Sequence, residues 1–207
     1  MRIIDISMTI RENMPVFRNR ADRRPLIWAA RDSKQTGCHE TRMDIDLHTG
    51  THLDTPKHMV EGGLSVDRVD LTKLIGECRV IDLTAVEECI RESDLKAHPI
   101  EPGSFVLLKT RNSFEEKYSD SFIWLDPTGA QYLRDVGVSG VGIDALRIEK
   151  EQRRQDTHKI LFSAGIVILE GLRLKEAEAG DYHLYALPLK IQGAEASPVR
   201  AVLVRED

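Results

Sequence analysis

The sequence predicts a mixed α/β fold that is rich in short strands. Apolar runs of strand length recur along the chain, bounded by Gly, Pro or polar residues, while helical patterns gather after residue 84. Neither an internal repeat nor a low-complexity linker interrupts the 207 residues, and a chain of this length can bury a sizeable core. We therefore expect a single domain over residues 1–207.

The expected strands follow in order along the chain. Residues 2–10 alternate in polarity, and Pro56 ends a strand over residues 43–53 that carries several histidines. Between these strands, residues 11–24 are rich in Arg, Asn and Pro, which predicts a long surface loop. Further strands are expected at residues 79–83, 105–109, 138–143, 166–170, 184–191 and 199–204.

Short helices are expected at residues 66–74, 85–92, 126–136 and 156–164. Thr84 is a suitable N-cap for the second of these, with Glu87 three residues later. Pro127 suits the first position of the third helix, and Gly165 ends the fourth. The predicted pattern is a strand-rich sheet with its helices in the second half of the chain.

Composition limits the partners and the compartment. A net charge of −5 gives no reason to expect nucleic acid or an anionic membrane as a partner. No apolar run approaches the ~20 residues that span a bilayer, and the N-terminus lacks the features of a signal peptide. Cys38, Cys78 and Cys89 are odd in number and widely spaced, which favours reduced thiols. We expect a cytoplasmic protein.

Residues 48–58 read His-Thr-Gly-Thr-His-Leu-Asp-Thr-Pro-Lys-His and gather three imidazoles and a carboxylate. On a strand, residues of equal parity share a face, so His48, His52 and Asp54 would converge. On a helix Asp54 would point elsewhere, and the residues between the histidines are poor helix formers. The strand interpretation predicts a site for a divalent metal such as Zn2+ or Mn2+.

Two further polar residues have apolar neighbours. His158 lies in an expected helix, and Glu170 ends an apolar run, where an unpaired buried carboxylate would be costly. A metal ion would remove that cost. The simpler alternatives are a hydrogen-bonded or surface histidine and an exposed turn glutamate before Gly171.

The tract closely resembles the His-x-Gly-Thr-His-x-Asp-x-Pro-x-His signature of the cyclase-like metal-dependent hydrolases. That family includes the bacterial kynurenine formamidases (arylformamidases of tryptophan catabolism) and the isatin hydrolases. The resemblance continues in order through residues 141–144, 156–159, 167–172, 186–190 and 197–201. It implies a layered β/β/α fold with mixed sheets, similar to swivelling domains, and a homo-oligomer such as a dimer or tetramer.

Carried over by position, the resemblance implies two metal ions, Zn2+ or Mn2+, in each subunit. His48, His52 and Asp54 would hold the first, and Asp54 would bridge to a second. His158 and Glu170 would hold this second ion.

The chemistry that this implies is hydrolysis of a carbon–nitrogen bond, with an aryl formamide such as N-formylkynurenine as the first candidate substrate. A divalent ion lowers the pKa of bound water from about 15.7 towards about 7, which supplies hydroxide at neutral pH. His58 resembles the family's proton carrier, and an amide nitrogen needs a proton in order to leave.

The substrate side departs from the formamidases. They commonly carry Trp-Pro-Gly-Asp in the first loop, whereas this chain has Met14-Pro15-Val16-Phe17. Phe17 is a candidate for stacking on a substrate ring, and a role as a loop anchor is the alternative. A cyclic amide or lactone hydrolase and a metal-binding protein without turnover remain as alternative functions.

Overall fold

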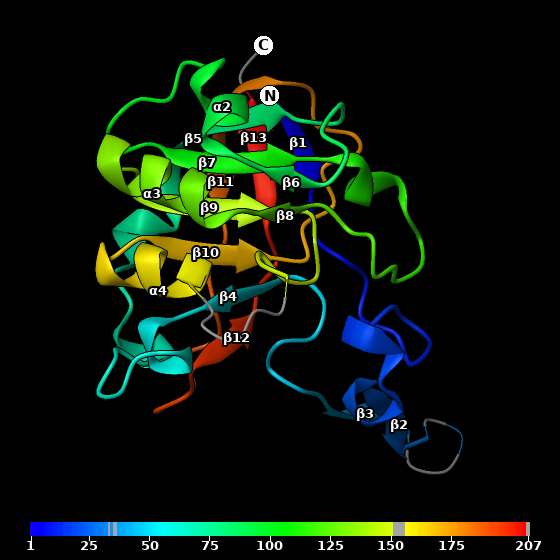
Figure 1. Ribbon diagram of the computed structural model, residues 1–207. Coiled ribbons are helices and arrows are strands. Elements are labelled where there is room, and N and C mark those ends of the chain that lie inside the picture. Colours follow the sequence, from blue (N-terminus) through cyan, green and yellow to red (C-terminus); the bar gives the residue numbers. More distant parts are fainter. Residues whose placement is uncertain (33, 35–36, 151–155, 206–207) are drawn as a thin grey trace.

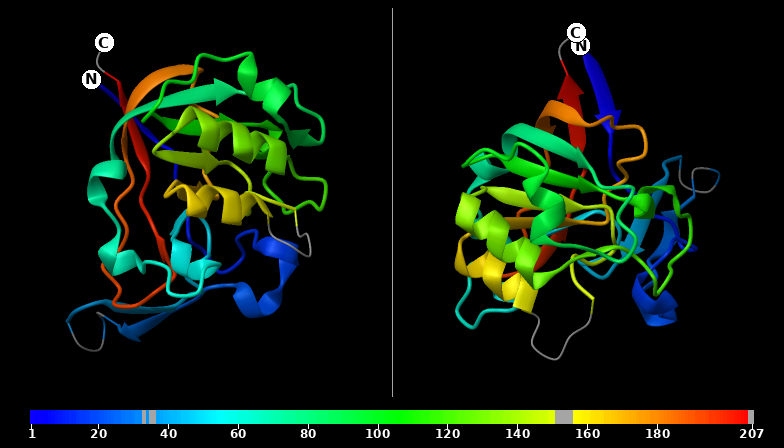
Figure 2. Two further views of the ribbon diagram at one scale, coloured as in Figure 1. Left: turned by 60° about the vertical axis from the view of Figure 1, so that its left-hand side comes forward. Right: turned by 45° about the horizontal axis from the view of Figure 1, so that its top comes forward.

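The structure is a computed structural model that describes residues 1–32, 34, 37–150 and 156–205. Its largest element is one mixed sheet of nine strands (Figure 1). In spatial order these are β1 (Arg2–Asp5), β13 (Val202–Arg205), β11 (Gly180–Tyr185), β5 (Ile75–Asp82), β7 (Phe105–Lys109), β9 (Gly140–Ile143), β10 (Val167–Glu170), β4 (His52–Asp54) and β12 (Ala196–Pro198). Because β1 pairs with β13, the two ends of the chain lie side by side (Figure 2).

The middle of the sheet is parallel and is buried on both faces. Strands β5, β7, β9 and β10 pair in parallel, and every residue of β7 is buried. Val106 and Leu108 point into a core shared with three helices. These helices are α2 (Glu92–Lys96), α3 (Pro127–Val136) and α4 (Asp156–Ser163). Continuous apolar runs are typical of strands covered on both sides.

The second core lies on the opposite face of the same sheet. Phe105 and Leu107 of β7 pack there with Ile4, Leu184 and Leu203 from the antiparallel strands. The antiparallel half therefore curls over the parallel half, which gives helices, sheet and sheet as three layers (Figure 2). The expected β/β/α layering is confirmed, with both β layers belonging to one continuous sheet.

Several expected elements are confirmed within a few residues. They include the strands at 79–83, 105–109, 138–143 and 166–170, and the helices at 126–136 and 156–164. The expected strand at 184–191 is the end of β11, which stops at Tyr185. The helical piece at 66–74 consists of two 3-10 turns, η4 (Val66–Arg68) and η5 (Leu71–Lys73).

The helix predicted over residues 85–92 is wrong. Asp82 accepts hydrogen bonds from the backbone N–H and the hydroxyl of Thr84, at 3.0 and 2.6 Å, so Thr84 closes a turn and does not cap a helix. The chain then forms β6 (Cys89–Ile90), which pairs in parallel with β8 (Trp124–Leu125). Helix α2 begins only at Glu92.

The first forty-four residues differ most from expectation. The loop at 11–24 contains two 3-10 turns, η1 (Phe17–Asn19) and η2 (Ala21–Arg23), and buries Met14 and Val16. A hairpin that was not predicted follows, in which β2 (Leu26–Arg31) pairs with β3 (Glu40–Asp44). This hairpin, called the arm below, projects from the body of the protein (Figures 1 and 2).

Two other expectations concern the whole chain. Cys78 and Cys89 are buried free thiols, and Cys38 is exposed. Among the described residues, none of the helices combines the length and the apolar character that crossing a membrane would require.

A close backbone contact joins the end of β10 to the turn that precedes β4. Gly171 has φ +66°, and a Cβ built on it would lie 2.1 Å from the carbonyl oxygen of Gly50. The Thr51 hydroxyl bridges the same place, because it donates to the Gly171 carbonyl at 2.6 Å and accepts from the Met8 N–H at 2.7 Å. Glycine at position 171 is therefore required both by its conformation and by space.

We predict that Gly171→Ala destabilises the protein more than Gly103→Ala. Gly103 also has positive φ, +78°, but nothing lies within 4 Å of its missing Cβ. Its substitution should cost only the left-handed strain, about 1–2 kcal/mol. Gly171→Ala must also displace a backbone carbonyl, and we expect a loss of about 3 kcal/mol or more in urea unfolding. Equal losses in the two variants would contradict the close contact.

Candidate metal centre

The centre begins with the antiparallel pairing of β4 and β10. His52 lies directly opposite Glu170 in the register, so their side chains share one face. His52 Nε2 is 3.3 Å from Glu170 Oε2 and 3.4 Å from Asp54 Oδ1. Both carboxylates and this imidazole are buried. His52 and Asp54 have equal parity on β4, as the sequence predicts.

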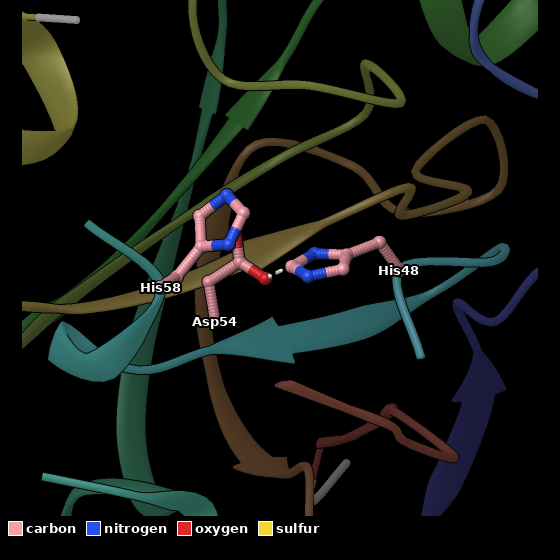
Figure 3. A group of neighbouring side chains, drawn as sticks. All are labelled: His48, Asp54 and His58. Carbon is pink, nitrogen blue, oxygen red and sulfur yellow. Dashed lines mark ion pairs between the residues drawn. The ribbon is translucent and has the colours of Figure 1, made fainter. Parts of the chain in front are cut away.

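His48 reaches the site by a different route from the one expected. The single strand predicted over residues 43–53 is wrong, because β3 ends at Asp44 and β4 begins at His52. His48 lies in a turn between them, held by a hydrogen bond from its N–H to Asp46 Oδ1 at 2.9 Å. The turn still brings His48 Nδ1 to 2.9 Å from Asp54 Oδ1 (Figure 3).

His158 enters from the helical layer. It projects from the first turn of α4, and its Nε2 lies 3.4 Å from Glu170 Oε1 and 3.7 Å from Asp54 Oδ2. The same oxygen of Glu170, Oε1, also accepts a hydrogen bond from the backbone N–H of Ile148 at 2.6 Å. His158 and Glu170, for which the sequence also allowed surface positions, are therefore both buried in the cluster.

His58 follows Asp54 through η3 (Pro56–His58). Pro56 ends β4, and the turn carries the His58 ring to 4.3 Å from the His48 ring, centroid to centroid. A ring nitrogen of His58 lies within 4.8 Å of ligand atoms of His48 and Asp54, and Figure 3 shows the three side chains together. This geometry would suit His58 either as a metal ligand or as a general base beside the ligands.

The ligand groups are divided differently from the expected pairs. One group consists of His48, Asp54 and His58, and the other of His52, Asp54 and Glu170. Asp54 belongs to both groups, which agrees with the expected bridge. His52 lies opposite Glu170 because β4 and β10 pair in this register, and its ring also lies 5.2 Å from the His48 ring, centroid to centroid.

The outer nitrogen of each buried imidazole has its own partner. His52 Nδ1 lies 2.9 Å from the Gly50 carbonyl oxygen, which can only accept, so Nδ1 carries the proton. His158 Nδ1 lies 2.6 Å from Glu149 Oε1, and Glu149 also accepts the Thr157 N–H at 3.0 Å. These partners direct the Nε2 atoms of both histidines into the cluster.

The inner atoms of the cluster fit a metal ion. In the described part of the chain, only four buried side-chain nitrogen or oxygen atoms have no partner in hydrogen-bonding geometry. Three of them are His52 Nε2, His158 Nε2 and Asp54 Oδ1, the last of which lies 2.9 Å from His48 Nδ1. Buried polar atoms without partners are rare and costly. Imidazole nitrogens and carboxylate oxygens are the donors that bind divalent transition metals.

The electrostatics of these residues are strongly coupled. Burial lowers the pKa of His52, but the carboxylates of Asp54 and Glu170 outweigh it and raise the pKa to about 9. Burial and Asp54 raise the pKa of Glu170, yet the histidines bring it to about 2. Burial lowers the pKa of His58, which favours its neutral form at neutral pH. The cluster therefore favours ionised carboxylates beside a neutral imidazole at position 58.

A cavity of about 260 Å3 opens onto the cluster. The metal-binding candidates His48, Asp54, His58, His158 and Glu170 line one part of it. The first loop and the loop after β9 line the rest, and their contribution includes Phe17, Arg18, Arg20, Arg23, Leu146 and Arg147. Phe17, predicted as a substrate-binding residue, does line this cavity.

Sequence reasoning missed the residues that support the ligands. Glu149 opens a run of charged residues, a pattern typical of a solvated surface, but it is 1% exposed and contacts His158. Its apolar neighbour Ile148 was the one available signal. Glu195 Oε1 lies 3.4 Å from His48 Nε2, and nothing in its local sequence indicates this.

Comparison with known proteins is consistent with this centre. The family model described as "Putative cyclase" matches residues 4–150. A kynurenine formamidase from Salinibacter ruber is 33% identical over 206 residues, covering 98% of this chain and 97% of the relative.

Solved structures agree with the sequence comparison. A "predicted metal-dependent hydrolase" from Bacillus stearothermophilus superposes with a TM-score of 0.89 at 44% identity, covering 98% of this chain and 97% of that one. Isatin hydrolase A from Labrenzia aggregata has the same fold, with a TM-score of 0.86 at 22% identity over 99% of this chain and 94% of that one. This chain belongs to the cyclase-like hydrolase family.

Proposed function

We propose that this hydrolase is metal-dependent and cleaves the amide bond of an aryl formamide such as N-formylkynurenine. One observation carries the proposal: three buried donor atoms from β4 and α4 converge without hydrogen-bond partners beside an open cavity. The kynurenine formamidase relative supports the reaction class, since it matches almost the whole chain.

His48, His52, Asp54, His158 and Glu170 would hold the metal, with Asp54 shared between two ions. The mixed nitrogen and oxygen donors suit Zn2+ or Mn2+. When bound, such ions activate water and polarise a carbonyl oxygen. The two ligand groups that share Asp54 support two ions in each subunit.

His58 would serve as the proton carrier. Its lowered pKa keeps the imidazole neutral, so that it can accept a proton from the attacking water. Its position on the cavity wall places it beside any bound substrate. The same ring can then donate that proton to the departing amide nitrogen, which would otherwise be a very poor leaving group.

The proposal predicts metal-dependent turnover. Protein stripped with a chelator should not hydrolyse N-formylkynurenine, and Zn2+ or Mn2+ should restore the activity. Isatin and simple lactones, assayed in parallel, distinguish the cyclic-substrate alternative. Tight metal binding without turnover of any of these substrates would contradict the proposal and favour a structural metal site.

The variant His58→Ala separates the ligands from the proton carrier. We expect it to keep its full metal content and to lose about 100- to 10,000-fold in kcat, the usual contribution of a general base. Metal analysis and kinetics should be done on the same preparation. Loss of one ion per subunit would instead identify His58 as a ligand of the group with His48 and Asp54.

We predict that Glu149 sets the metal affinity through His158. Glu149→Ala removes the acceptor at 2.6 Å and should weaken metal binding by about 10- to 100-fold, whereas Glu149→Gln retains an acceptor oxygen and should lose less. Competition with a chromogenic chelator measures the affinity. Glu92→Ala is the matched control, because it removes a carboxylate contact of similar length, to Lys96 Nζ at 2.7 Å, that involves no proposed ligand. Unchanged affinity in Glu149→Ala would contradict this role.

We also propose that the chain forms a homo-oligomer through the arm. Two-stranded ribbons are at best marginally stable alone in water, and this one exposes Leu26, Trp28 and Met43 by 45–58%. Packing against a second copy would cover them.

Light scattering should therefore show a dimer or a larger oligomer. Trp28→Glu should shift the equilibrium towards monomer, because it places a charge in the covered surface. Leu71→Glu, at a similarly exposed apolar position outside the arm, should not. A monomeric wild-type protein would contradict the proposal.

A further inference from the structure

We infer that Arg147 is a specificity-determining residue that binds an anionic group of the substrate, so that the preferred substrates are ring-bearing amides that also carry a carboxylate. The inference rests on the proposed amide hydrolysis and adds to it the charge of the substrate. It depends on the position of Arg147, its lack of a carboxylate partner and the neighbouring surface of Phe17.

Arg147 differs from Arg20 and Arg23, two cavity arginines that pair with carboxylates. Arg20 pairs with Asp22, and Arg23 Nε lies 3.8 Å from Asp46 Oδ2. Arg147 is half-buried and forms no ion pair with any carboxylate among the residues that the structure describes. A partly desolvated guanidinium without a counter-charge favours an anion that arrives with the ligand.

The backbone around Arg147 is fixed to the metal centre on its C-terminal side. The next residue, Ile148, donates its N–H to Glu170 Oε1 at 2.6 Å. The residue after that, Glu149, contacts His158 Nδ1 at 2.6 Å. Arg147 is thus carried by the same short segment that orients two of the proposed ligands. These two contacts fix the backbone next to Arg147 relative to the metal centre.

The Phe17 ring holds this cation at the cavity wall. The Arg147 guanidinium carbon lies over the Phe17 ring, 5.5 Å from its centre, and the Arg18 guanidinium carbon lies over the same ring at 5.5 Å. The ring is supported by edge-to-face packing against Tyr118 at 5.5 Å and Phe122 at 6.4 Å. A substrate ring that enters the cavity beside this stack would therefore have a cation within reach of its substituents.

The backbone that presents Phe17 is strained. Arg18 and Asn19 follow it with φ values of +58° and +50°, although neither is glycine. Such conformations cost free energy and persist where the surrounding structure requires them, which is common at binding sites. The loop thus holds Phe17 against the cavity at an energetic cost, as expected for a residue that contacts ligand.

The charge of the occupied centre favours the same substrate class. Two divalent ions would carry four positive charges against the three buried carboxylates of Asp54, Glu170 and Glu149, so Arg147 would add to a positive cavity. Convergent positive charge in a concave site attracts anions and disfavours cations. A neutral aryl formamide would not use this charge, whereas a carboxylated one would.

The test compares formanilide with its 2-, 3- and 4-carboxylated derivatives, the formamidobenzoates. These compounds share the aryl formamide and differ in the carboxylate and its position. In the metal-loaded wild type, kcat/KM should be higher for at least one carboxylated compound. Arg147→Gln should lower the ratio of carboxylated to neutral kcat/KM by about 10- to 100-fold, the range for a charged hydrogen-bonded contact. Arg24→Gln, an exposed arginine outside the cavity lining, removes the same charge and should leave the ratio unchanged.

Two outcomes would overturn the role of Arg147. One is equal kcat/KM for formanilide and all three formamidobenzoates in the wild type. The other is a loss in Arg147→Gln that is the same for neutral and carboxylated substrates, which would indicate a general structural effect.

Failure of the proposed function is distinguishable from failure of this inference. If the wild type hydrolyses none of the formamides, calorimetric binding of benzoate and benzamide still tests Arg147 without turnover. Tighter binding of benzoate in the wild type, abolished in Arg147→Gln, would support the anion site. Equal binding of the two compounds in the wild type would overturn it.

Discussion

Two buried carboxylates on neighbouring strands are the constraint on which the site depends. The register of β4 and β10 places Asp54 and Glu170 in the same closed space, and neither is more than 3% exposed. Like charges in a medium of low polarity repel strongly and cannot both stay ionised without compensation. The imidazoles of His48, His52 and His158 approach them from a turn, a strand and a helix, and this need for positive charge or for a metal explains their positions.

The surrounding backbone keeps that arrangement in place. The close contact between Gly50 and Gly171 fixes the turn that presents His48 against the end of the strand that presents Glu170. Glu149 performs the equivalent task for His158, because a buried carboxylate on the outer nitrogen fixes both the tautomer and the ring direction. Ligands separated by more than a hundred residues are thus positioned by local contacts, and weakening one contact disturbs one ligand first.

The sequence predicted the chemistry of the site better than its geometry. Residue types and the resemblance identified the residues that gather around Asp54, but parity on one strand was the wrong reason for including His48, which arrives through a turn. Glu149 was missed because it begins a run of charged residues, and the composition of such a run does not show whether its first member is buried or solvated. The helix expected after Thr84 failed because Asp82 captures the Thr84 N–H, a competition that N-cap patterns do not register. The arm was missed although residues 26–30 are an apolar run of strand length.

The cavity divides into a part that performs chemistry and a part that selects substrate, and the two are built from different elements. Strands β4 and β10 and helix α4 hold the polar cluster, whereas the loop at 15–23 contributes Phe17 and can change without altering a proposed ligand. The segment 146–149 belongs to both parts, because Arg147 faces the cavity while Glu149 contacts His158. Substrate range should therefore vary most easily through the first loop, where a substitution leaves the metal centre intact. A change within 146–149 must preserve His158 as well, and this restricts how the anion-binding residue can be replaced.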